Sequence, residues 1–587
     1  MATTENPRTP DTPAARDLPT FTIKVSGQAL ARSYGVLSVR VQKEANRIPT
    51  AHLLLKDGSP AGATFPVSNE SLLVPGQALE VWAGYHGQEA VIFKGLIIKH
   101  GIEGRSSGST RLALTCKDAF VKTTLAPQRR YFIDKKDSEV AEDIVQRYAG
   151  LRVEAQATAV KHAELLQYDA TDWDFLVMRA EANGQLCLVD DGKLTLAKPD
   201  PGQTAVTKLQ YGATILEFDA EMDARDQAQT LTTTTWSYAD SAIAQARAAE
   251  PPAGNFGNFS ADDLAHVLQT DLTLPHGGHR PTEELQAWAD AALLKRRLAR
   301  IRGRVRFYGN AEVKPGTVIS LAGLGERFSG EAYVTGVSHR LESGSWLTDA
   351  QFGLDPRAFT AEVTVSPPAA SGLVPGALGL QIGVVTALEN DPAGEERIAV
   401  RLPVIDPAAD GARARVLSID AGNGRGFYFR PEIGDEVVVG FLNNDPRDAV
   451  VLGALHSSHN PIPSLFTTAD ANNRKGYVSR SQLQLLFDDD QKTLTLATPA
   501  GNTLKLDDDA KRITLQDQHG NKIVLDAAGI TIESHKALTL KAATDAKLEG
   551  MNVALSAQAQ FKATGSAGVE LSSSATAVLK GSMVMIN

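Results

Sequence analysis

The fold is decided by the last part of the chain, residues 530–587, which read ITIESHKALTLKAATDAKLEGMNVALSAQAQFKATGSAGVELSSSATAVLKGSMVMIN. Pairs of mainly apolar positions recur there at steps of eight residues, with a single step of seven, from Ile530/Ile532 to Met585/Asn587. One residue separates the two members of each pair, which is the alternation of a strand with one buried face. A short fixed period of such strands predicts a β-helix.

This segment has too few large apolar side chains to build a core within one chain. Its 58 residues include only 17 Ile, Leu, Val, Met and Phe, and burying so few does not balance the entropy lost on ordering the segment. Three copies around a threefold axis would bury identical seams against one another. We therefore predict a trimeric, intertwined β-helix needle. Its predicted core consists of Ile530, Ile532, Leu538, Leu540, Leu548, Val553, Leu555, Phe561, Val569, Leu571 and Leu579.

The sequence GSMVMIN at 581–587 is unusually apolar for the end of a chain. It is either the last layer of the needle core or, in three copies, a flat apolar platform that a separate protein covers. On the second interpretation the surface that binds a tip protein consists of Met583, Val584, Met585, Ile586 and Asn587.

Strand alternation at a longer spacing precedes the octad segment. Apolar pairs such as Leu494/Leu496 and Ile523/Leu525 are separated by the turn sequences DDD, GN and HGN. We assign residues 483–587 to the spike and residues 461–482 to a neck.

A compact β unit is predicted over residues 378–460, after a Pro/Gly/Ser-rich linker at 366–377. Five short strands in about 80 residues indicate a small closed barrel of the OB type. The strands are expected at Leu380–Leu388, Ile398–Leu402, Gly426–Arg430, Glu436–Phe441 and Ala449–Leu452.

Residues 20–365 are expected to be mainly β with a few helices, behind a flexible arm at 1–19 that lacks the apolar run of a signal peptide. Short strands separated by Gly and Pro favour a barrel or a sandwich. Strands are expected at Tyr34–Val41, Ala78–Ala83, Ala90–Ile98, Leu112–Thr115, 215–235 and 304–365. One helix is expected at Ser138–Ala149, and a second begins at Thr171, with Asp174 completing a capping box. A third helix is expected at Thr282–Arg302, with Thr282 as its cap.

Composition argues against several classes of function. The chain of 587 residues has a net charge of −10, and residues 378–460 carry seven Arg, no Lys and twelve acidic residues. A barrel that binds nucleic acid needs a positive groove, so we expect no nucleic-acid partner. The two cysteines, Cys116 and Cys187, lie in apolar runs and are expected to be buried thiols.

No catalytic or metal-binding constellation stands out, and we expect neither enzymatic activity nor a cofactor. His276/His279 and His456/His459 have a spacing that could bind a metal, but they lie in Gly/Ser loops without acidic or Cys neighbours. The runs Asp488–Asp490 and Asp507–Asp509 are explained by hairpin turns. The alternative is a tail-spike enzyme that degrades cell-surface polysaccharide or peptidoglycan.

Two stretches of the OB segment, PEIGDEVVVGF and NDPRDAVVLG, closely resemble the OB domain of the VgrG family, the hub-and-spike proteins of contractile injection systems and phage tails. YDATDWDFLVMRAEANG and LVDDGKLTLAKP resemble the hub region of the same family. The resemblance covers the chain from about Phe21 to Asn587. It leaves open whether the system is type VI, extracellular, membrane-anchored or phage.

The resemblance implies a homotrimer at the centre of a baseplate. Its hub, with two β-barrel subdomains per chain, would carry the inner tube protein and contact baseplate proteins. A PAAR-like protein would cap the needle tip, and separate effectors would be the cargo. Sheath contraction would drive the spike into the target envelope with transient membrane contact. The resemblance further implies assembly in the cytoplasm, and a particle that is released or acts across the envelope.

Overall fold

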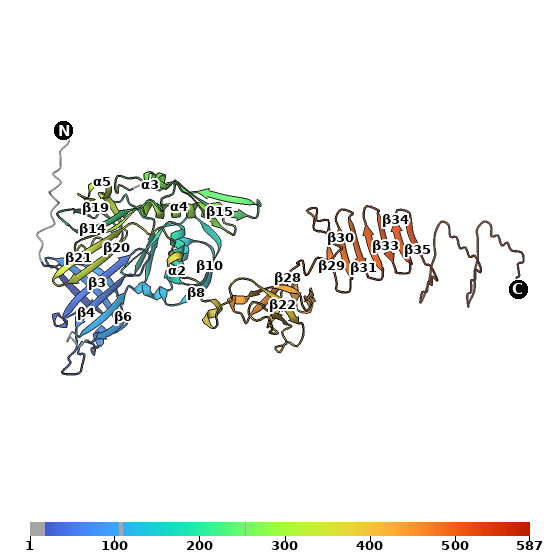
Figure 1. Cartoon of the computed structure of the whole chain (residues 1–587), viewed down its shortest axis with the longest axis horizontal. Helices are drawn as coiled ribbons and strands as arrows, with labels where there is room; N and C mark the ends of the chain where they lie inside the picture. Colours follow the sequence, from blue (N-terminus) through green and yellow to red (C-terminus); the bar gives the residue numbers. More distant parts are fainter. Residues whose placement is uncertain (1–17, 105–109, 253, 587) are drawn as a thin grey trace, which may run out of the picture. The chain divides into compact units, whose positions relative to one another are not determined.

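The computed structural model describes residues 18–104, 110–252 and 254–586. It divides into two compact units, the first ending at Pro375 and the second beginning at Gly376, and each is described by itself. The architecture is mainly β, as the sequence predicts, with few helices (Figure 1). Among the described residues no helix is long and apolar enough to cross a membrane.

The first unit is built on one sheet of 13 strands, in the order β14-β18-β21-β20-β3-β4-β7-β6-β5-β1-β2 with β13 and β19 joined beside β20. The strands are β1 (Thr20–Val25), β2 (Gln28–Ala29), β3 (Val36–Glu44), β4 (Thr50–Lys56), β5 (Ala78–Tyr85), β6 (Gln88–Glu103), β7 (Arg111–Lys117), β13 (Thr207–Gln210), β14 (Ile215–Met222), β18 (Ile301–Tyr308), β19 (Val318–Ala322), β20 (Gly330–Glu342) and β21 (Ser345–Phe352).

This sheet carries two separate apolar cores. One gathers side chains of β1 and β3–β7, and the other gathers side chains of β13, β14 and β18–β21. Antiparallel pairing of β3 with β20 joins the two halves, with His339 opposite Val41. The strands that carry the two cores are therefore continuous in one sheet.

Smaller sheets and six α-helices complete the part of this unit that the structure describes. The remaining strands are β8 (Pro127–Lys136) paired with β10 (Lys161–Thr171), β9 (Arg152–Ala155) with β11 (Leu186–Asp190) and β12 (Lys193–Ala197), and β15 (Thr230–Ser237) with β16 (Ala242–Arg247) and β17 (Asp271–His276). The helices are α1 (Asp137–Val145), α2 (Asp172–Ala182), α3 (Ala261–Leu268), α4 (Thr282–Leu298), α5 (Gly325–Phe328) and α6 (Phe359–Glu362).

The predicted helices form, with corrections at their ends. The Thr171 hydroxyl accepts a hydrogen bond from the Asp174 N–H, which confirms the predicted cap of α2. Helix α1 ends at Val145 rather than Ala149, because the chain then turns toward Gly150. Thr282 is the first residue inside α4 and does not cap it, since Pro281 holds the capping position without a side-chain bond. The segment 353–358 contains no strand, contrary to the strand expected through 365.

Buried charges connect distant parts of the first unit. Lys43 on β3 is almost fully buried and forms an ion pair with Asp190, which also binds Lys314 at 2.7 Å. His339 on β20 lies nearby, and its Nδ1 is 3.0 Å from the Thr348 hydroxyl. Burial, aided by Lys43 and Lys314, lowers the pKa of His339 to about 3. Cys116 and Cys187 are buried free thiols, as predicted.

The second unit opens with a closed barrel in the order β22-β23-β24-β28-β27. The strands are β22 (Gln381–Ala387), β23 (Ile398–Arg401), β24 (Ala412–Val416), β27 (Glu436–Phe441) and β28 (Ala449–Ala454), with β25 (Ala421–Gly422) and β26 (Arg425–Gly426) in a small hairpin outside it. This confirms the OB-type barrel. The strand predicted at Gly426–Arg430 is wrong, because β24 takes its place in the barrel.

A meander of seven antiparallel strands follows, which Figure 1 shows as a ladder. The strands are β29 (Arg474–Val478), β30 (Gln484–Asp488), β31 (Thr493–Ala497), β32 (Thr503–Asp507), β33 (Arg512–Gln516), β34 (Lys522–Asp526) and β35 (Gly529–Glu533). Residues 534–586 contain no strand. The spike segment of a single chain is thus an antiparallel sheet followed by chain without strands.

The buried imidazole predicts a pH dependence for the first unit. His339 is neutral when folded and titrates near 6.5 when unfolded. Its folded pKa is lowered, so its contribution to stability is present above about pH 6.5 and decreases as the pH falls toward 3. Protonation of this group is expected to lower the free energy of unfolding by about 1.4 kcal/mol for each pH unit between about pH 6.5 and 3.

We expect His339→Gln, which can keep the bond to Thr348 without titrating, to flatten the pH dependence of the melting temperature of this unit between pH 7 and 5. Calorimetry of both forms at several pH values measures the difference. If the melting temperatures of the two forms change equally with pH, His339 is not the source of the pH dependence.

Candidate trimerisation surface and spike tip

One face of the β29–β35 sheet is apolar. Leu496 is opposite Leu485 on one side and Leu504 on the other, and Leu515 is opposite Leu504 and Ile523. Opposed residues and residues two apart on a strand share a face. The apolar face therefore comprises Tyr477, Leu485, Phe487, Leu494, Leu496, Leu504, Leu506, Ile513, Leu515, Ile523, Leu525, Ile530 and Ile532.

The opposite face is mainly polar. Its central row is Leu486, Thr495, Lys505, Thr514, Val524 and Thr531, and its outer rows hold mostly charged and amide side chains. Such a sheet is amphipathic and needs a cover on one side only.

No part of the described chain covers the apolar face. Leu515 is 50% exposed and Ile532 is 52% exposed, although both belong to an unbroken row of aliphatic side chains. Full burial of one such side chain stabilises by roughly 1.5–3 kcal/mol. A contiguous apolar surface of this kind marks an interface.

Regular short turns hold the two edges of the sheet. At one edge Asn521 accepts a hydrogen bond from the His535 N–H at 2.9 Å, and Asn502 accepts one from the Gln518 N–H at 3.1 Å. At the other edge the Asp488 and Asp507 carboxylates accept backbone N–H bonds of their own turns. The turns between strands β30 to β35 cover only 489–492, 498–502, 508–511, 517–521 and 527–528.

Local partners lower the pKa of several edge carboxyl groups. The Asn521 side chain bonds to Asp517, and Lys522 pairs with Glu533 at 3.0 Å, so the pKa of each carboxyl lies below its usual range. The Gln491 N–H and Arg474 do the same for Asp488. Asp488 and Asp517 are therefore held by contacts within their turns, and Glu533 by a pair across two strands.

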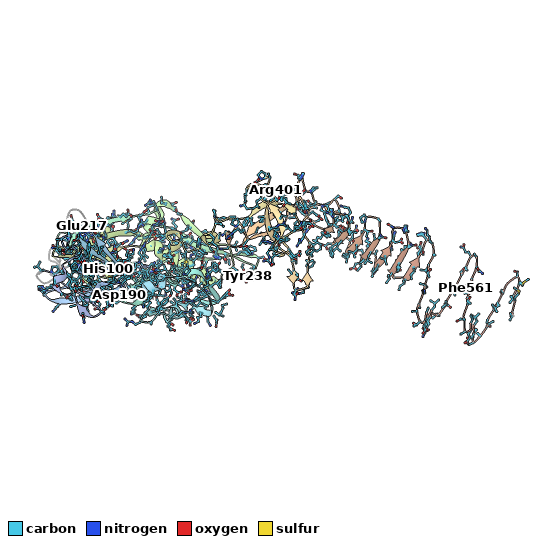
Figure 2. All side chains as sticks on the ribbon, turned by 90° about the horizontal axis from the view of Figure 1, so that it is seen from below. His100, Asp190, Glu217, Tyr238, Arg401 and Phe561 are labelled. Atoms are coloured by element: carbon cyan, nitrogen blue, oxygen red, sulfur yellow. The ribbon has the colours of Figure 1, made fainter. Side chains whose placement is uncertain are left out.

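The octad segment contains no strand beyond β35 in a single chain. Of the predicted core residues, Ile530 and Ile532 lie on β35, and the others lie on the extended chain, where Figure 2 shows Phe561. All eleven are exposed, between 52% for Val553 and 85% for Leu571. Within one chain these residues are not brought together.

The predicted tip residues Met583, Val584, Met585 and Ile586 are also exposed, and Ile586 is 87% exposed. Asn587 lies outside the described residues. The tip side chains make no apolar core with any described part of the same chain.

The histidine pairs serve local structure. His276 Nδ1 bonds within its loop to Gly278, and the His279 ring lies 4.8 Å from the ring of Tyr238. His456 Nδ1 is 3.3 Å from the Asn460 carbonyl oxygen. Over the described part of the chain, no group of three or more His, Cys, Asp or Glu residues is placed to hold a metal ion.

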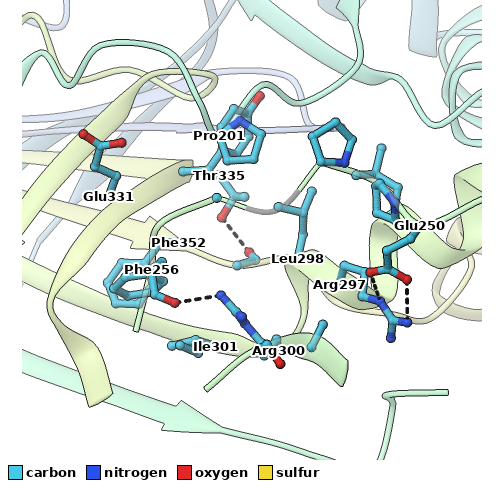
Figure 3. Close-up of a pocket in the computed structure, with 18 of the residues that line it drawn as sticks. Pro201, Glu250, Phe256, Arg297, Leu298, Arg300, Ile301, Glu331, Thr335 and Phe352 are labelled. Atoms are coloured by element: carbon cyan, nitrogen blue, oxygen red, sulfur yellow. Dashed lines mark hydrogen bonds and ion pairs between the residues drawn. The ribbon is translucent and has the colours of Figure 1, made fainter. Parts of the chain in front are cut away.

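A cavity of about 470 Å³ lies in the first unit beside α4 (Figure 3). Three of its polar side chains are bound within the chain. Arg300 donates to the Phe256 and Phe259 carbonyl oxygens at 2.7 Å, Arg297 pairs with Glu250 at 2.7 Å, and Thr335 donates to the Gly353 carbonyl oxygen. These contacts hold the loops around the sheet in place.

Sequence reasoning overlooked two parts of the surface. Tyr477, Leu485 and Phe487 extend the apolar face upstream, and the alternation in QLQLLFD is the signal that could have found them. The aromatic run at 427–429 was expected in a barrel strand, whereas it lies exposed outside the barrel.

Family models match three successive parts of the chain. Residues 15–343 match the Alg8 N-terminal domain, residues 381–456 match the type VI secretion system/phage-baseplate injector OB domain, and residues 493–587 match the phage baseplate V C-terminal trimerisation domain. The last two confirm the resemblance to VgrG-type hub-and-spike proteins, and strands β31 to β35 of the apolar sheet lie within the match to the trimerisation domain. Because the first match covers more than half of the chain, the chain belongs to the Alg8 N-terminal domain family.

Solved structures of tail and secretion proteins are more distant. The tail protein from Neisseria meningitidis is 15% identical, with a TM-score of 0.42 over 57% of this chain and 96% of its own. The E. coli c3393 protein, a component of the type VI secretion system, is 11% identical, with a TM-score of 0.39 over 74% and 99%. A chain of a Francisella PdpA–VgrG complex is 8% identical, with a TM-score of 0.38 over 88% and 80%. A search of the curated proteins finds no match.

Adjacent residues on opposite faces of β33 provide a matched test of the apolar face. We expect Leu515→Asp to weaken or abolish trimer formation, because each copy would bury an unpaired carboxylate at a cost of about 3 kcal/mol or more. Thr514→Asp, on the polar face, should leave the trimer intact. Light scattering and thermal denaturation of both variants measure the effect. Equal behaviour of the two would show that the apolar face is not the interface.

Proposed function

We propose that this chain forms the homotrimeric central hub and spike of the baseplate of a contractile injection system. The observation that carries the proposal is the uncovered apolar face, most of which lies within the match to the trimerisation domain. Three such sheets, with their apolar faces turned to a common axis, would exclude water from every row at once.

The proposed organisation has a hub at 20–365, a linker at 366–377, an OB domain at 378–460, a neck at 461–482 and a spike at 483–587. The arm at 1–19 lies mostly outside the described residues, which begin at Leu18.

The octad segment would complete the needle. In a trimer the strands of one copy gain neighbours from the other two, so the backbone groups unpaired in one chain become bonded. The predicted core from Ile530 to Leu579 would then fill the axis. A needle without open sheet edges is stiff and unfolds slowly. These properties suit a part that pierces an envelope when the sheath contracts.

The remaining roles fall to other parts of the chain. The hub would seat the inner tube protein and contact baseplate proteins, and the apolar end at Met583–Ile586 with Asn587 would bind a PAAR-like tip protein. The protein would act mechanically, without a catalytic step of its own. Effector proteins would be delivered as separate cargo, and the spike would touch the target membrane only in passing.

Light scattering on the purified full chain is the first test. We expect a mass three times that of the 62.6 kDa chain at micromolar concentration. A monomer at all these concentrations would contradict the proposal.

Tube assembly is the second test. Mixed with the inner tube protein, the trimer should increase the number of tubes seen by electron microscopy, with the protein at one end of each. Leu515→Asp should lose this effect and Thr514→Asp should keep it. If the number of tubes is the same with both variants, the chain does not act as the hub.

A further inference from the structure

Three consecutive aromatic residues lie exposed on the surface of the OB barrel. Phe427, Tyr428 and Phe429 are 53%, 73% and 59% exposed, in a segment that belongs to none of the barrel strands. The apolar core of the barrel is complete without them. Exposed aromatic rings that are not needed for the core of their own domain are typical of interfaces.

The segment that carries these rings is held firmly to the barrel. The Ser418 hydroxyl donates to the Asp420 and Phe427 carbonyl oxygens at 2.9 and 2.8 Å. Beyond the rings, Arg430 donates to the Leu388 carbonyl oxygen at 3.0 Å and to the Glu396 carbonyl oxygen at 2.7 Å. The rings are therefore presented in a fixed position, which lowers the entropy lost on docking.

The aromatic rings connect directly to the apolar face of the sheet. Phe427 stacks on Phe429 with ring centroids 6.1 Å apart, and Phe429 meets Tyr477 edge to face at 5.1 Å. Tyr477 is opposite Leu485, the first aliphatic residue of the row that leads through Leu496. An exposed ion pair of Glu432 with Arg480 at 3.0 Å also links the barrel segment to the turn after β29.

We propose that Phe427, Phe429 and Tyr477, here called the aromatic collar, pack against a second copy of this chain in the trimer. The collar continues without a polar break into the apolar face, and the part of that face on β31 to β35 lies within a trimerisation domain that begins at residue 493. The intersubunit seam would thus extend upstream of that domain and lock each OB barrel to the spike. The proposal rests on the trimer proposed above.

Tyr428 supplies a matched control within the same segment. Its ring lies under the guanidinium of Arg430, 5.0 Å from the ring centroid, and not in the row that joins Phe429 to Tyr477. It is the most exposed of the three rings in one chain, so exposure alone does not distinguish it from the collar.

Thiol labelling of the full chain tests the collar. The native Cys116 and Cys187 are buried, and burial raises the pKa of Cys116 to about 12, so their background reaction with a maleimide is slow. We expect Phe429→Cys to react about tenfold more slowly than Ala393→Cys, at an exposed turn of the same barrel, when both are trimers. In denaturant the two rates should become equal.

The outcomes separate this inference from the function on which it rests. Equal labelling rates in a protein that light scattering shows to be trimeric would overturn the collar alone, and would leave the rings as open surface. A monomeric chain would overturn both proposals.

Thermal dissociation of the trimer is the second measurement. Phe429→Ser should dissociate at a lower temperature than the parent, and Tyr428→Ser should dissociate close to it. An equal decrease of the dissociation temperature in both variants would overturn the collar. This measurement does not require the cysteine variant to fold.

Discussion

The uncovered apolar face of the β29–β35 sheet is the constraint on which the rest of the second unit depends. Its rows of Leu, Ile, Phe and Tyr are aligned by register, so the hydrogen bonds that build the sheet also gather its apolar side chains on one side. A single chain satisfies the backbone of this sheet but not its side chains. Residues 534–586 lack still more contacts, because within one chain they form neither strands nor an apolar core.

The first unit differs from this sheet, because its apolar cores are buried within one chain. Two apolar cores lie along a single sheet, and buried ion pairs join segments that are far apart in sequence. The Lys43–Asp190 pair fixes β3 against the hairpin of β11 and β12, and breaking such a pair leaves an uncompensated charge in the interior. The unit can thus be rigid by itself, whereas the β29–β35 sheet of the second unit leaves its apolar face uncovered.

Much of the fold follows from local patterns, whereas the contacts between distant residues do not. The alternation at Leu494/Leu496 and Ile523/Leu525 predicted strands that the structure contains, and Thr171 predicted the start of α2. The third barrel strand was misplaced because ARARV at 412–416 alternates Ala with Arg and looks polar, whereas GFYFR has the aromatic content of a strand. No local pattern pairs Lys43 with Asp190, 147 residues away, or Phe429 with Tyr477. The needle core and tip residues remain predictions, since their contacts would come from other copies.

The short turns at the edges of the sheet have a mechanical consequence. Between strands β30 and β35 none is longer than five residues, and the Asn502 and Asn521 side chains bind each turn to the next on that edge. The flanks therefore carry no protruding loop that could snag on a lipid bilayer or a peptidoglycan mesh. A shaft with such smooth sides would meet little friction along its length, so the force of a single stroke would be concentrated at its point.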